Sequence, residues 1–245
     1  LDRSHIIEGF ALTYDFEIKK GIDNYIKSKK TQKKASEVFN VVTAPDKSSF
    51  MVEEGRDLLG ILAEIQKNKR LSALFRSKSA EGILSGLSNF KKIYSMLETH
   101  RKKYYWIKNF YGGSKILTLG HFVSELKIML KKGMDAKKLI SWQEAKLKNS
   151  LKEKKFLLKK LSFPGELRDL IEISNQIGAW QDGRKMHILK SIHYLDLLLA
   201  EIGKRYNFKE EFARYLLPYE VTEKDLKKIS NNLLENRKKG CIIIA

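Results

Sequence analysis

The residues that could do chemistry fall into two short clusters in which aromatic rings alternate with cations. The first is the segment 100–106 (HRKKYYW), whose rings could stack on nucleic-acid bases or on a nucleotide ring. The second is the segment 180–185 (WQDGRK), whose guanidinium could clamp a phosphate or a carboxylate. The candidate contact surface therefore comprises His100, Lys103, Tyr104, Tyr105, Arg184 and Lys185.

Both clusters also have a structural interpretation, which we favour. On a helix, the rings of 100–106 would join the core while the lysine stems lie along the surface and keep their charged heads in water. Arg184 would pair with Asp182 or across to another helix. A third segment, 215–222 (YLLPYEVT), is expected to be a connection before the last helix.

Several motifs that would indicate an enzyme are missing from the sequence. It has neither a G-x-x-x-x-G-K-[ST] phosphate loop nor a G-x-G-x-x-G fingerprint, and no H-E-x-x-H metal pair. His187 and His193 are six residues apart, which places them on opposite sides of a helix. Cys241, the single cysteine, cannot make a disulfide scaffold or a thiolate metal cage by itself. We therefore assign no catalytic, cofactor-binding or metal-binding residue.

The net charge of +19 invites a nucleic-acid interpretation, because clustered cations gain affinity by releasing counterions from phosphates. However, 38 of the 48 cations are lysines and only 10 are arginines, whereas phosphate and guanine sites favour the arginine fork. The lysines are also spread through every segment, as expected for solvated helix faces. Nucleic acid is thus a possible but disfavoured partner.

Helical periodicity dominates the chain and predicts an all-α fold of about seven to nine helices, with at most a short terminal strand at 240–245. We expect one helical domain with a possible sub-division into 1–45, 46–134 and 135–245. Helix starts are predicted at Ser48 or Ser49, at Asp135 and at Thr222, whose side-chain oxygens can cap a first turn. Gly178 and Gly183 are possible kinks in a long helix, and Trp106 and Trp180 are expected to be buried.

The sequence also predicts where the protein is located and whether the chain is a fragment. No stretch approaches the roughly 20 apolar residues that span a bilayer, and the first residues do not form an export signal. We expect a cytoplasmic protein that makes no membrane contact. Because position 1 is Leu and the chain stops after the apolar run 241–245, we also expect a piece of a longer protein.

Taken in order, several segments resemble one family. They are 41–50 (VVTAPDKSSF), 100–111 (HRKKYYWIKNFY) with a following Phe122, W-x-D-x-R-K at 180–185, 193–199 (HYLDLLL), L-L-P-x-E at 216–220 and E-x-R-K-K-G at 235–240. This succession is similar to the helical middle region of phosphoenolpyruvate synthase-like (pyruvate, water dikinase-like) enzymes. The likeness covers about Asp23 to Ala245 and rests on scattered hydrophobic and aromatic positions.

In that family an ATP-grasp domain phosphorylates a histidine on a swivelling domain, which passes the phosphoryl group to pyruvate. The resemblance thus implies ATP and Mg²⁺ for a complete parent enzyme but no cofactor in this chain. The family's acceptor histidine follows glycines in a Thr/Ser-His context that Ser4-His5 lacks, so no catalytic role is transferred to His5.

The resemblance implies a non-catalytic helical connecting domain that positions a mobile phosphohistidine domain. Its partners would be the other domains of the same phosphotransferase, and the chain would have no activity of its own. The alternative function is a basic helical module that binds RNA or DNA.

Overall fold

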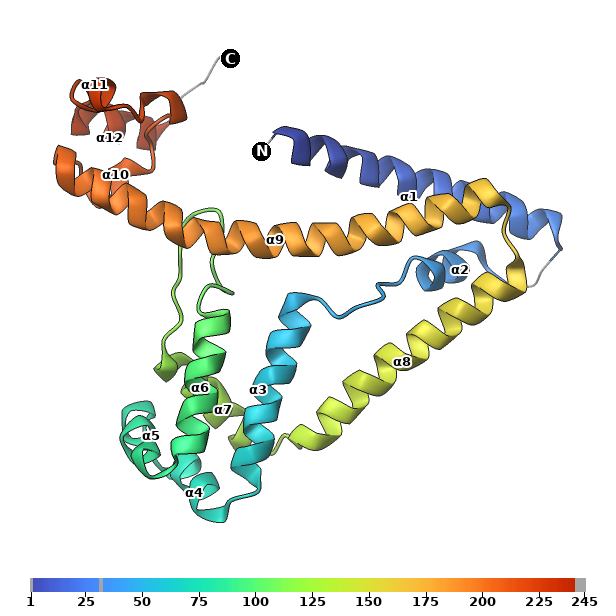
Figure 1. Cartoon of the computed structure of the whole chain (residues 1–245), viewed down its shortest axis with the longest axis horizontal. Coiled ribbons are helices and arrows are strands. Elements are labelled where there is room, and N and C mark those ends of the chain that lie inside the picture. The colour runs from blue at the N-terminus through green and yellow to red at the C-terminus, as the bar shows by residue number, and fades with distance from the viewer. Residues whose placement is uncertain (1, 31–32, 241–245) are drawn as a thin grey trace. The chain divides into compact units, whose positions relative to one another are not determined.

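The computed structural model describes residues 2–30 and 33–240, and for residues 2–12 and 210 it describes the backbone alone. Within these ranges every element is helical, apart from one isolated bridge between Phe110 and Gly113, so the all-α prediction is confirmed. The predicted strand at 240–245 falls largely outside the described residues. The elements are α1 (Asp2–Ser28), α2 (Ala35–Val42), α3 (Phe50–Gln66), α4 (Lys69–Ser77), α5 (Ala80–Gly86), η1 (Leu87–Asn89), α6 (Lys91–Tyr104), α7 (Leu119–Lys131), α8 (Ala136–Leu161), α9 (Gly165–Tyr206), α10 (Glu210–Ala213), η2 (Pro218–Glu220), α11 (Glu223–Leu226) and α12 (Asn231–Lys239) (Figure 1).

The chain forms two compact units. Unit 1 takes in the described residues up to Tyr105 together with Leu117–His187, and unit 2 combines Trp106–Ile116 with the described residues from Ile188 onward. Helix α9 contributes to both units. The boundaries differ from the sub-division at 45 and 134, because the segment 106–116 makes its hydrogen bonds with residues of α9 and beyond.

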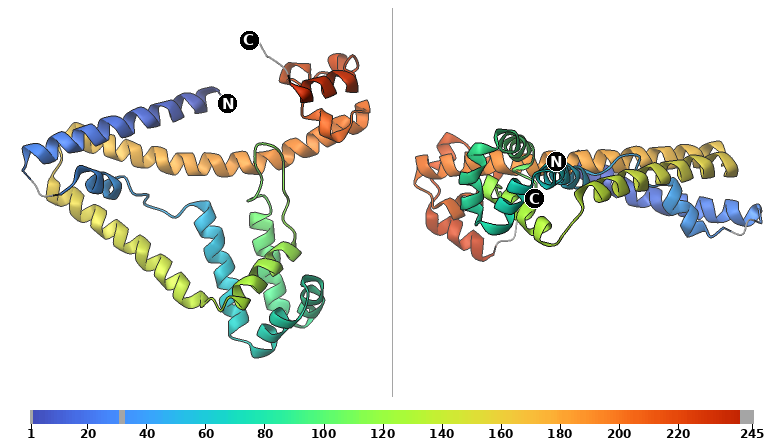
Figure 2. Two further views of the ribbon diagram at one scale, coloured as in Figure 1. Left: turned by 180° about the vertical axis from the view of Figure 1, so that it is seen from behind. Right: turned by 90° about the horizontal axis from the view of Figure 1, so that it is seen from below.

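One part of unit 1 is a core shared by α1, α2, the end of α8 and the start of α9. The four-residue spacing of Ile18, Ile22 and Ile26 puts these side chains on one face of α1, and they are buried here with Leu157 and Leu167 among others. Each such side chain contributes about 1.5–3 kcal/mol when fully buried. Helix α2 packs against α1 and α8, as the view from behind also shows (Figure 2). Apolar burial therefore fixes the position of α8 beside the loop 43–49.

The other part of unit 1 gathers α3 to α7. Helix α3 packs against α4, α6 and α7, and its apolar side is fully buried at Leu58, Leu62 and Ile65. Caps define the starts of these helices: Ser49 accepts from Val52 N, as predicted, while Asn68 and Ser79 cap α4 and α5. The described residues form more helices than the predicted seven to nine, partly because Asn68 and Ser79 each cap a short helix.

Sequence-predicted boundaries elsewhere are also found. Asp135 caps α8 by accepting from Lys138 N, and Thr222 caps α11 by accepting from Asp225 N. Gly133, with φ +67°, follows the end of α7. Helix α9 is continuous over 42 residues, and Gly178 and Gly183, the two possible kink positions, both lie within it. None of the described helices combines the length and apolar character needed to cross a membrane.

The two tryptophan predictions have different outcomes. Trp106 is 2% exposed, so its burial is confirmed, and Lys190 Nζ lies 5.0 Å from its ring centroid within unit 2. Trp180 is 37% exposed, so the prediction of burial is wrong. The apolar positions of α9 recur on more than one side of the helix, and periodicity alone did not tell which side is covered.

Unit 2 holds the segment 106–116 against α9. Asn109 donates to Leu189 O at 2.8 Å, Ser114 N donates to Asp196 at 2.7 Å, and Arg214 donates to Asp196 at 2.8 Å and to Gly112 O. Glycine is required at 113, where φ is +144° and a Cβ would lie 2.2 Å from the Arg214 guanidinium. A small apolar core of Phe208, Phe212, Leu226 and Leu234 closes the C-terminal part.

Candidate functional site

Half of the predicted contact surface forms an internal network between α6 and α3. His100, with its side chain 2% exposed, lies with Nε2 3.0 Å from Glu54 Oε1. The Tyr104 hydroxyl and Lys103 Nζ both donate to Asp57 Oδ2, each at 2.8 Å. The His100 ring also lies 4.8 Å from the Tyr104 ring between centroids. The spacing 100–103–104 thus places these groups toward acidic partners on α3.

The electrostatics of this network hold its charges in place. Burial alone would raise the pKa of Asp57, but hydrogen bonds from Lys103 and Tyr104 and the lysine charge bring that pKa below its ordinary value. The hydrogen bond to Asp57 raises the pKa of Lys103. Burial, which disfavours the phenolate, raises the pKa of Tyr104 to about 12. The network therefore joins two helices and leaves the buried Tyr104 ring inaccessible for stacking.

The other predicted residues lie elsewhere in unit 1. Arg184 on α9 has its guanidinium carbon 5.5 Å from the Trp180 ring centroid, and Lys185 is exposed. Asp182, two residues before Arg184, accepts a hydrogen bond from Phe50 N, at the start of α3, at 3.1 Å. Tyr105 follows α6 and accepts from Leu117 N. The contacts described for Arg184 and Asp182 thus belong to the packing of α9 and to the start of α3.

A lysine that the sequence did not single out anchors the loop before α3. Lys154 on α8 is 6% exposed at its side chain and donates to Ala44 O at 2.8 Å, Asp46 at 2.7 Å and Asn175 at 2.9 Å. Asn175 on α9 in turn donates to Val42 O at 3.2 Å. This cluster fixes the loop 43–49 over one side of α8.

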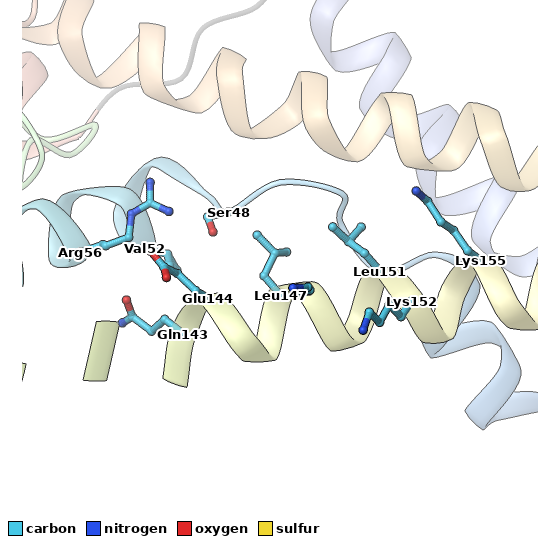
Figure 3. A pocket seen from close by; sticks show the side chains of 10 residues that line it. Ser48, Val52, Arg56, Gln143, Glu144, Leu147, Leu151, Lys152 and Lys155 are labelled. Atoms are coloured by element: carbon cyan, nitrogen blue, oxygen red, sulfur yellow. The ribbon is translucent and has the colours of Figure 1, made fainter. Parts of the chain in front are cut away.

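Next to this loop, unit 1 contains a cleft of about 360 Å³ between α8 and the start of α3. Its floor is apolar, formed by Val52, Leu147 and Leu151, and Figure 3 shows both leucines rising from α8 toward the segment that carries Ser48. Val52 is 45% exposed, so the floor is open to solvent. Gln143 also lines the cleft, and its Oε1 is buried without a hydrogen-bond partner among the described residues.

The rim of the cleft is strongly cationic. Arg56 on α3 and Lys148, Lys152 and Lys155 on α8 line it, with Glu144 as the single carboxylate. In the described part of the chain, none of these five side chains makes an ion pair or hydrogen bond. The cleft therefore combines an apolar surface with unneutralised positive charge.

Sequence reasoning missed this cleft, although a signal for it exists. Lys148, Lys152 and Lys155 recur at the i, i+4, i+7 spacing that lines one helix face, next to Leu147 and Leu151. For this part of the chain we predicted only a helix that starts at Asp135. Nothing local showed that the α2–α3 loop would face this flank of α8.

No group of three or more His, Cys, Asp or Glu side chains is placed to hold a metal ion within residues 2–30 and 33–240. Comparison of the chain with protein-family models, curated proteins and solved structures finds no match.

Proposed function

We propose that this chain is a non-catalytic helical connecting domain of a phosphoenolpyruvate synthase-like phosphotransferase, and that it positions a mobile phosphohistidine domain. The observation that supports this role is that polar side chains within the segments of the family resemblance make internal structural contacts. ATP, Mg²⁺ and the phosphoryl acceptor would belong to the other domains of the parent enzyme, which are its partners.

Contacts of this kind are found in most segments of the resemblance. Asp46 pairs with Lys154, His100 with Glu54, and Asp182 accepts from the first amide of α3. In unit 2 the Glu220 carboxylate receives a two-pronged ion pair from Arg237, with both distances 2.7 Å. Residue types that could serve chemistry are thus used to join helices, which is the expected pattern for a scaffold.

Helix α9 supplies the physical basis of a connecting role. It contributes residues to both units as one helix, and its 42 residues correspond to a length of about 60 Å. The nucleic-acid alternative has less support, because Tyr104 is buried and Lys103 is bound to Asp57. Both residues belong to the segment 100–106, whose rings could have stacked on bases.

The absence of catalysis is tested by incubating the purified chain with labelled ATP, Mg²⁺ and pyruvate. We expect no label on protein or pyruvate, because the sequence lacks a phosphate loop and an acceptor histidine in a suitable context. Acid-labile label on any of the five histidines would contradict the non-catalytic assignment.

The connecting role is tested by measuring whether α9 keeps its length in solution. Spin labels at Glu172→Cys and Lys204→Cys, in a Cys241→Ser background, are separated by 32 residues of helix, or about 48 Å. Pulsed electron spin resonance should give one narrow distance distribution near this value. A broad distribution centred at much shorter distances would show that α9 does not connect the units as a continuous helix, and would reject the proposed role.

A further inference from the structure

The cleft beside α8 has a combination of features that the connecting role does not use. Some surface cations elsewhere in unit 1 have anionic partners: Lys67 and Lys92 both pair with Glu64, and Lys103 pairs with Asp57. At the cleft the cations have no such partner among the described residues. Gathering like charges without anions is unfavourable for folding, so a bound anion would relieve their repulsion.

The floor of the cleft adds a second requirement. Leu147 and Leu151 stand on neighbouring turns of α8, and Val52 faces them from α3. Figure 3 also shows Arg56 and Lys155 near opposite ends of this apolar row. A volume of about 360 Å³ lies at the lower end of the range of small-molecule sites. The buried Oε1 of Gln143 offers an acceptor for a ligand donor or a water.

We propose that this cleft binds an amphipathic organic anion. The hydrocarbon or ring portion of the ligand would lie on Val52, Leu147 and Leu151, and its carboxylate, phosphate or sulfonate group would lie at Arg56 or Lys155. Neither a purely polar anion nor a neutral lipid satisfies both surfaces. This inference goes beyond the proposed connecting role and does not depend on it, because all the residues involved belong to unit 1.

The direct probe is 8-anilinonaphthalene-1-sulfonate, which joins an apolar ring system to a sulfonate and fluoresces when it leaves water. The whole chain should bind it saturably, and binding should weaken as salt rises because rim charges are screened. Dodecanoate should displace the probe. Dodecyltrimethylammonium, with the same chain and a positive head, should not.

Matched variants separate the cleft from the rest of the basic surface. Arg56→Glu combined with Lys155→Glu should weaken probe binding about tenfold, since two rim attractions become repulsions. The control is Lys131→Glu combined with Lys137→Glu, which makes the same charge change at exposed lysines outside the cleft and should change affinity less than about twofold. Leu147→Asn tests the apolar floor and should weaken binding of the probe. The charged variants should keep the helical content of the wild type.

Three results would overturn the proposal. The first is equal binding by the cleft and control double variants. The second is equal displacement of the probe by the cationic and anionic amphiphiles, which would indicate a merely hydrophobic patch. The third is a combined result: a single-stranded oligonucleotide displaces the probe at a lower concentration than dodecanoate does, and Leu147→Asn leaves probe binding unchanged. This result would identify the cleft as part of a nucleic-acid surface.

Discussion

Replacing Lys154 with Met should destabilise unit 1 more than any surface substitution on the same helix. Methionine keeps most of the apolar stem of the lysine, so the change removes chiefly the ammonium and its three hydrogen bonds. The acceptors on Ala44 and Asn175 are half-buried and lose a charged donor. The loop 43–49 should then detach more readily from α8 and α9.

The magnitude follows from the exposure of each partner. Asp46 is largely exposed, so its pair with Lys154 contributes at most about 1 kcal/mol. The bonds to Ala44 O and Asn175 are worth about 1 kcal/mol each after partial access of water to the acceptors. The expected loss is therefore about 2–3 kcal/mol, or roughly 5–10 °C in the melting temperature of a unit of this size.

The assay is urea unfolding followed by circular dichroism, with Lys159→Met as the control because Lys159 is an exposed lysine on α8. The control should change stability by less than about 0.5 kcal/mol. A double-mutant cycle of Lys154→Met with Asn175→Ala should give a coupling energy of about 1 kcal/mol. If Lys154→Met and Lys159→Met unfold at the same urea concentration, the anchoring role assigned to Lys154 is wrong.

Three further predictions test the helices and the α3–α6 network. Gly178→Ala should stabilise the protein by about 0.5–1 kcal/mol, because no atom lies within 4 Å of a Cβ there and alanine favours a helix; an unchanged or lower urea midpoint would argue that α9 is not helical at this point. Trp106→Ala should cost about 3–5 kcal/mol by thermal or urea unfolding, whereas the partly exposed Trp180→Ala should cost clearly less, and equal costs would contradict the two burial states. In a spectrophotometric titration, Tyr104 should ionise near pH 12, after tyrosines of ordinary pKa. Because the pKa of Tyr104 is raised in the folded state, its contribution to stability is complete below about pH 10 and is lost between about pH 10 and 12. Tyr104→Phe should remove this late step, and a late step that persists in the variant would assign it to another tyrosine.

Much of the helical architecture could be predicted because its causes are local. The four-residue spacing of Ile18, Ile22 and Ile26 and the cap at Asp135 act within one or two turns. Burial depends instead on which elements meet. Trp180 lies on a periodic apolar pattern, yet it is over a third exposed, since nothing in the pattern says which side of α9 is covered.

The candidate site was harder to predict than the helices, because it depends on contacts between residues that are far apart in the sequence. Lysine is seldom buried, so no local rule distinguishes Lys154 from its neighbours, and its partner Ala44 is 110 residues away. The cleft arises because the anchored loop lies over one flank of α8. Its cations were visible in the sequence as a helical stripe, but the apolar floor contributed by Val52 was not.

The anchoring of segment 106–116 has a consequence for how the protein is made. Its partners Asp196 and Arg214 are 82 and 102 residues further along the chain from Ser114 and Gly112. At a synthesis rate of roughly 5–20 residues per second, this segment would wait about 4–20 s before those partners are translated. Helices α3 to α6 precede it, so unit 2 can close only after most of unit 1 has left the ribosome. A gene fragment that starts at Ile188 would therefore encode an unfinished unit, which could be completed by supplying the peptide 106–116 in trans.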